Sequence, residues 1–126
     1  MILTFLLLVL TTILCSVFYV VGIIYTVLRS FKHKGLKKYF YQIAFSLDQT
    51  GNVVCGPLFN DLLIAPNGHR MGNQDETISH VLGMNLKGNT LYPFGILISK
   101  VVDKTAYLMS KEVNHCLNAA NNSQKN

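Results

Sequence analysis

The chain has 126 residues and a formal net charge of +5, and half of its residues are hydrophobic. This length leaves room for one small domain beside a membrane segment. The excess positive charge lies in one stretch, because Tyr39 to Asn126 holds six basic and six acidic residues. The five remaining cations are Arg29, Lys32, Lys34, Lys37 and Lys38. A nucleic-acid-binding surface needs cations along a groove-facing surface, so this distribution favours anionic lipid headgroups and argues against nucleic acid.

Residues Ile2 to Leu28 form an apolar run of 27 positions without any charged residue, His, Asn, Gln or Pro. As a helix the run spans about 40 Å, against about 30 Å of bilayer hydrocarbon. We therefore predict a transmembrane anchor at 1–28, followed by a basic juxtamembrane collar at 29–38 that contacts the membrane surface. Because cations only follow the run, the N-terminus is expected outside and the C-terminus in the cytoplasm. A secretion signal is the alternative, but the chain lacks a basic n-region and an A-x-A-like cleavage site.

Small residues recur at four-residue spacing within the predicted anchor. The pairs are Thr12 with Ser16 and Gly22 with Thr26. Small residues at this spacing let two membrane helices approach closely, so they favour a homo-oligomer through the anchor. Any long apolar run contains a few such pairs, which is the plainer explanation.

The chain from 39 to 120 is predicted to be a small cytoplasmic domain of about four short helices, which makes the protein mainly α. The predicted segments are Leu36 to Leu47 ending at a Gly51-Asn52 turn, a helix opened by Pro57, Gly72 to Gly83, and a run from a Thr90 cap to about residue 118 that breaks near Asp103-Lys104. Their apolar positions follow helical spacing. The last residues, 121–126, are polar and are expected to be a disordered tail.

The segment from Gly72 to Gly83 has the clearest helix signature. Asn73 is expected to cap the helix, with Glu76 reaching back three residues later. Asp75 and Glu76 would then place negative charge at the positive end of the helix dipole. Gly83 suits the left-handed position that follows a helix.

Three of these polar residues also suggest acid–base or metal chemistry, namely Asp75, Glu76 and His80. A metal site needs three or four convergent ligands, and only His69 lies near enough in sequence to join them. Two carboxylates at a helix N-terminus and a surface histidine explain the same residues without a metal. We therefore expect no metal, no cofactor and no catalytic residue; the glycines form no phosphate-binding motif, and the three cysteines form no C-x-x-C.

The central block reads Gly72-Asn-x-Asp-Glu-Thr-Ile-Ser-x-Val-Leu-Gly-x-Asn85, followed by Gly88-x-Thr-Leu-x-x-x-Gly95. Upstream lie the basic-flanked anchor, Ser46-Leu-Asp-Gln-x-Gly-Asn-Val-Val and Leu58-Phe-Asn60. Over about residues 36–116, this pattern resembles a group of small membrane proteins encoded by tailed bacteriophages and prophages. The group has no assigned activity, so the resemblance implies origin and setting rather than mechanism.

The resemblance singles out, as candidate functional or structural residues, Asp48, Asn52, Asn60, Asn73, Asp75, Glu76, Thr77 and Asn85. The chain departs from the pattern at Met71, at His80, where the group usually has a small residue, at Met84 and at Tyr92-Pro93. A common fold alone would require polar residues at caps and turns.

We expect a non-enzymatic, phage-encoded, single-pass protein of the bacterial inner membrane. Its helical module would bind an unknown protein partner in lysis, superinfection exclusion or interference with the host. One alternative is a membrane-tethered, metal-dependent hydrolase that uses Asp48, Asp75, Glu76 and His80. Another is a small holin-like pore former, for which a large cytoplasmic domain is unusual.

Overall fold

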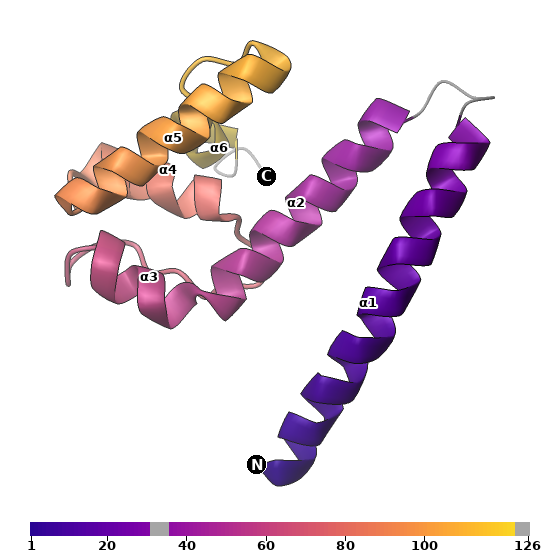
Figure 1. Cartoon of the computed structure of the whole chain (residues 1–126). Helices are drawn as coiled ribbons and strands as arrows, with labels where there is room; N and C mark the ends of the chain where they lie inside the picture. Colours follow the sequence, from indigo (N-terminus) through magenta and orange to yellow (C-terminus); the bar gives the residue numbers. More distant parts are fainter. Residues whose placement is uncertain (31–35, 123–126) are drawn as a thin grey trace. The chain divides into compact units, whose positions relative to one another are not determined.

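The computed structural model describes residues 1–30 and 36–122, and most of these residues lie in helices (Figure 1). The helices are α1 (Ile2–Ser30), α2 (Leu36–Val54), α3 (Gly56–Leu63), α4 (Ile78–Gly88), α5 (Pro93–Ser110) and α6 (His115–Asn122). The described residues contain no strand, only an isolated antiparallel bridge between Ile64 and Leu91. The predicted fold class is confirmed: one long apolar N-terminal helix precedes several shorter helices.

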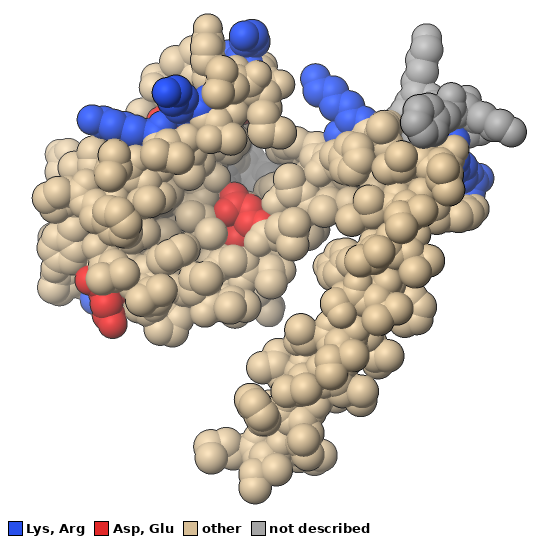
Figure 2. All heavy atoms as spheres, viewed as in Figure 1, with Lys and Arg blue, Asp and Glu red and all other residues tan. Residues whose placement is uncertain are grey.

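Helix α1 is long and apolar enough to cross a membrane. The stretch Ile2–Arg29 has a mean hydropathy of 2.6 over its best window, and none of that window is buried within the protein. Figure 2 shows this rod without acidic or basic side chains along most of its length. Hydroxyl groups of Thr12 and Ser16 bond within the helix: Thr12 Oγ1 donates to Leu8 O at 2.7 Å and Ser16 Oγ to Ile13 O at 2.7 Å. Such internal pairing is what a bilayer demands of polar groups.

The chain divides into two compact units, Met1–Gln42 and Ile43–Asn126. In the first unit, Arg29 lies exposed in α1, and Lys37 and Lys38 lie exposed in α2. The other two collar residues, Lys32 and Lys34, lie outside the described residues, as does the predicted tail from residue 123 onward. The remaining tail positions, 121 and 122, belong to α6.

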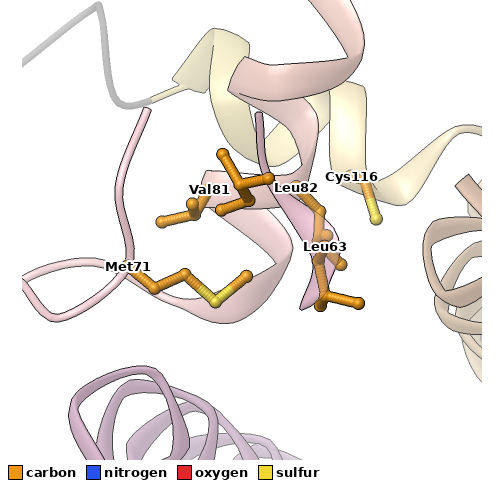
Figure 3. Close-up of a cluster of buried hydrophobic side chains, with 6 residues drawn as sticks. Leu63, Met71, Val81, Leu82 and Cys116 are labelled. Atoms are coloured by element: carbon orange, nitrogen blue, oxygen red, sulfur yellow. The ribbon is translucent and has the colours of Figure 1, made fainter. Parts of the chain in front are cut away.

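The second unit has a small apolar core centred on α4 (Figure 3). The buried members are Leu63, Ile64, Met71, Val81, Leu82 and Cys116. Partly buried apolar side chains from α3, α4 and α5 pack around them. Helix α4 therefore lies at the centre because its Val81 and Leu82 meet side chains from α3, from the loop after α3 and from α6.

Helix α2 does not end where the sequence predicted. The prediction of a turn at Gly51-Asn52 is wrong, since the helix continues to Val54. A Cβ added at Gly51 would lie 3.0 Å from Ile78 Cδ1, and Asn52 is fully buried. Tertiary contacts here override the weak helix propensity of both residues. The next helix, α3, begins as predicted, with Pro57 in its first turn.

The prediction for Gly83 is also wrong. This residue is buried in the middle of α4. The helix instead ends at Gly88, and the capping residue after it, Asn89, has a left-handed φ of 51°. A Cβ added at Gly83 would overlap the carbonyl oxygen of Cys116 in α6 and lie 2.9 Å from the Ala120 Cβ. Glycine is therefore required here for close approach of two helices, not for a turn.

The last helical run breaks later than predicted. Helix α5 passes through Asp103 and Lys104 and ends at Ser110, and Lys111 takes a left-handed φ of 61°. The predicted Thr90 cap is wrong, since Tyr92 precedes α5 and makes no side-chain cap. Asp103 serves the next helix instead: its carboxylate accepts the Cys116 N–H at 2.8 Å near the start of α6. The role of Asp103 is therefore to bond the start of α6 and not to break α5.

Candidate functional site

A long connection, residues 64–77, joins α3 to α4 and carries four of the eight polar residues that the resemblance singled out. Loops of this length are uncommon in compact domains and are often functional. Because the loop has no helix of its own, its backbone polar groups need partners elsewhere. Three asparagines on the surrounding helices supply many of them.

Two of these asparagines each bond both backbone groups of one loop residue. From α4, Asn85 accepts the His69 N–H at 2.9 Å through Oδ1 and donates to His69 O at 2.8 Å through Nδ2. From α3, Asn60 accepts the Met71 N–H at 2.8 Å and donates to Met71 O at 3.0 Å. Each side-chain amide thus makes the two backbone hydrogen bonds that a neighbouring strand would otherwise make. Together the two amides fix the loop at positions 69 and 71.

The third asparagine fixes the second half of the loop. From the end of α2, Asn52 donates to Asn73 O at 2.7 Å and to Glu76 O at 2.9 Å. Its Oδ1 accepts the Gly72 N–H at 3.3 Å. The φ of Gly72 is +122°, a conformation that L residues rarely adopt, so glycine is needed at this point. The fully buried Asn52 side chain therefore sets the path of the backbone that leads to Glu76.

The start of α4 differs from the prediction. The cap is Thr77, whose Oγ1 accepts the His80 N–H at 3.1 Å, and the helix begins at Ile78. Asn73 instead forms a local turn in which its Oδ1 accepts the Asp75 N–H at 3.1 Å. Asp75 and Glu76 precede the helix, whose first turn contains no acidic residue. The carboxylate at this N-terminus comes from α2, since Asp48 accepts the Ile78 N–H at 3.1 Å and the Ser79 hydroxyl at 2.9 Å.

With the loop fixed in this way, three side chains converge: His69, Glu76 and His80. The His69 Nε2 lies 3.0 Å from both carboxylate oxygens of Glu76. The His80 Nε2 lies 3.5 Å from Glu76 Oε1. The two imidazole rings meet edge to face with their centroids 6.1 Å apart. One nitrogen or oxygen from each of the three side chains lies within 4.8 Å of the others.

The environment of His80 also differs from the prediction. It was expected at the surface, but it is 8% exposed because it faces α6. Its Nδ1 lies 3.3 Å from the Ala119 carbonyl oxygen. A carbonyl oxygen only accepts, so the Nδ1–H tautomer of His80 can donate to it, and Nε2 is the atom that faces Glu76. Within the cluster, His80 is buried, Glu76 half-buried and His69 exposed, so the cluster opens to solvent on the His69 side.

Other candidate residues lie apart from this cluster. Asp48 serves the start of α4, and Asp75 is exposed outside the three-residue group. A second His–Glu contact joins His115 Nδ1 to Glu112 Oε2 at 2.8 Å, and it lowers the pKa of the Glu112 carboxyl. Burial raises the pKa of the Cys116 thiol, which makes this cysteine a poor nucleophile.

Sequence reasoning named His69 as the only nearby ligand but did not place it in a site. The available signal was the spacing His69, Glu76, His80, in which seven residues separate the first pair and four the second. The four-residue spacing from Glu76 to His80 suits one helix face. The seven-residue spacing from His69 to Glu76 lies in the loop, so whether these two residues meet depends on the asparagine contacts.

In comparisons with known proteins, no family model, curated protein or solved structure matches the chain.

Proposed function

We propose that the protein is a phage-encoded, single-pass protein of the bacterial inner membrane whose helical module binds a protein partner at that membrane. A lysis accessory, a superinfection-exclusion factor and an inhibitor of a host membrane process all share this arrangement. The observation that carries the proposal is α1, an apolar helix of 29 residues with no buried position in its best 18-residue window. A helix of this kind is stable in lipid and would aggregate in water.

The proposed orientation places the C-terminus in the cytoplasm. It rests on the cations that follow α1, of which Arg29, Lys37 and Lys38 are described and exposed. Anionic headgroups attract such cations by about 1 kcal/mol each near the surface. The residue pattern shared with small phage membrane proteins supports the setting in an infected or lysogenic bacterium.

The interaction role rests on the outward face of α5. Its inward face is packed through Gly95, Ile98 and Ser99. Its outward stripe consists of Phe94, Leu97, Val101 and Leu108, which are 51–67% exposed. At 3.6 residues per turn these four side chains fall within about 60° of arc.

So narrow an apolar seam at three-, four- and seven-residue steps is typical of a surface that packs against another helix. The partner we propose therefore presents an apolar helical face.

The membrane role is tested by expressing the full chain and a chain that begins after α1 in bacteria. We expect the full chain to sediment with inner membranes and to alter host growth or lysis, and the shortened chain to do neither. Equal effects of the two chains on the host would contradict the proposal. A C-terminal green fluorescent protein should fluoresce and a C-terminal alkaline phosphatase should stay inactive, since the phosphatase works only in the periplasm.

The partner role is tested with Leu97→Glu and Val101→Glu together, which place charge in the outward stripe. Lys100→Glu is the matched control, because Lys100 is exposed on the same helix but off the stripe. We expect the double variant to keep its membrane location and lose its effect on the host, and the control to keep both. A double variant that acts like the parent would refute a role for this stripe. Cross-linking of two full chains through the stripe would identify the partner as a second copy.

A further inference from the structure

The geometry points to a binding site for one divalent metal ion of the zinc class, with His69, Glu76 and His80 as ligands. This inference is independent of the membrane role. In a tetrahedral zinc site with bonds of about 2.0–2.1 Å, neighbouring ligand atoms lie about 3.3 Å apart. Here Glu76 lies 3.0 Å from the Nε2 of His69 and 3.5 Å from that of His80. Small side-chain adjustments bring all three ligand atoms, now within 4.8 Å of one another, to that spacing.

The ligand atoms of the cluster face one another. The Glu76 carboxylate contacts the Nε2 atoms of both His69 and His80. In the tautomer that lets His80 Nδ1 donate to the Ala119 carbonyl, Nε2 can act as a metal ligand. One metal ion would then bind both imidazoles and the carboxylate at once.

The surroundings resemble the outer shell of a metal site. Metal-ligating histidines usually donate their second N–H to a carboxylate, a carbonyl or water, and the His80 Nδ1 lies 3.3 Å from the Ala119 carbonyl oxygen. The other two ligands are fixed through their backbones, since Asn85 bonds His69 and Asn52 bonds Glu76. The backbones of these two ligands are thus held in place before any ion arrives. The exposed His69 leaves an approach from solvent, where water would complete the coordination.

The donor set selects the class of ion. Two imidazoles and one carboxylate suit Zn²⁺, Co²⁺, Ni²⁺ and Fe²⁺, whereas Mg²⁺ and Ca²⁺ prefer oxygen ligands alone. The cluster contains no thiolate, which disfavours Cu⁺. We therefore expect strong binding of Zn²⁺, weaker binding of Co²⁺ and no competition from a large excess of Mg²⁺.

The test uses the full chain, purified in detergent with an affinity tag that contains no histidine and stripped with a chelator. Calorimetric titration with Zn²⁺ should show one ion per chain, and Co²⁺ should give visible absorption bands that Zn²⁺ abolishes. Glu76→Gln and His69→Ala should each weaken Zn²⁺ binding by at least about 10-fold. Zn²⁺ should also raise the melting temperature of the parent chain and leave that of Glu76→Gln unchanged.

The matched control is His115→Ala, which removes the other His–Glu contact and should keep the parent affinity, because that contact offers only two ligands. His69 is exposed, so His69→Ala keeps the test decisive even if Glu76→Gln fails to fold. Absence of Zn²⁺ binding by the parent chain would overturn the proposal and leave a proton-linked His–Glu cluster. Binding that His69→Ala and His115→Ala weaken equally would overturn it as well.

Discussion

Asn85 bonds both backbone groups of His69, accepting its N–H at 2.9 Å and donating to its carbonyl at 2.8 Å. The same side chain donates to Val81 O in its own helix and accepts the Thr90 hydroxyl. One fully buried amide therefore ties α4 to the loop before it and to the turn after it. Buried polar networks of this kind specify one arrangement, provided that every member is paired.

Replacement of Asn85 by Ala should destabilise the domain strongly. The change leaves the N–H and carbonyl of His69 unpaired in a partly buried setting, at a cost of up to about 1–3 kcal/mol for each group. We expect the free energy of unfolding to fall by about 2–4 kcal/mol, measured by urea denaturation of the full chain in detergent micelles. Asn121→Ala, at an exposed position in α6, is the control and should have little effect. Parent-like stability of Asn85→Ala would show that the amide bonds are not needed.

Replacement of Gly83 by Ala should separate α4 from α6. The added methyl group would overlap the Cys116 carbonyl, which is backbone and cannot rotate away. We expect a loss of about 1–3 kcal/mol or more in the free energy of unfolding. Gly88→Ala is the matched control in the same helix, since its Cβ would meet only the Thr90 side chain at 3.5 Å. That control should change stability by less than about 1 kcal/mol, and equal losses for both variants would refute the close-approach argument.

Replacement of Asp48 by Ala should weaken the start of α4. Its carboxylate bonds the Ile78 N–H and the Ser79 hydroxyl, and hydrogen bonds to charged groups contribute about 1.5–3 kcal/mol. We expect a loss of about 2 kcal/mol and faster amide hydrogen exchange in the first turn of α4. Asp61→Ala removes an exposed carboxylate from α3 and should leave both measurements unchanged. Unaltered exchange in Asp48→Ala would rule out this capping role.

The buried Cys116 thiol should make stability decline in alkaline solution. Burial raises its pKa in the folded state above the ordinary value of 9.0. Below that value both states hold the proton and the thiol has no pH effect. Above it the unfolded state loses the proton first, so the free energy of unfolding falls by up to about 1.4 kcal/mol per pH unit. Comparison of the parent with Cys116→Ala between pH 8 and pH 10 isolates this slope. Parallel curves would contradict it.

The elements whose signals are local could be predicted from the sequence. The apolar run of α1, the helical spacing that opens α2, and Pro57 in the first turn of α3 all depend on neighbours within a few residues. The helix class of the whole chain followed from them. Positions whose role is set by a distant partner could not be predicted in this way.

Gly83 and Asn52 show why. Both residue types are typical of turns, and both lie inside helices because of contacts with residues more than 20 positions away. The cluster of His69, Glu76 and His80 was not predicted for the same reason. Its three residues were noted in the sequence, but the asparagine bonds that bring His69 to Glu76 are long-range. Three of the polar residues selected by resemblance, Asn52, Asn60 and Asn85, make the side-chain bonds to this loop, although the pattern alone did not reveal what they hold.

The packing of Gly83 against Cys116 also bears on how the chain is made. The buried face of α4 stays uncovered until α6 has formed, and α6 extends to Asn122. During synthesis, the apolar segment of α1 leaves the ribosome long before the residues that close the core. Until the last helix is made, the nascent domain therefore exposes this face of α4, and in that interval it is open to chaperones.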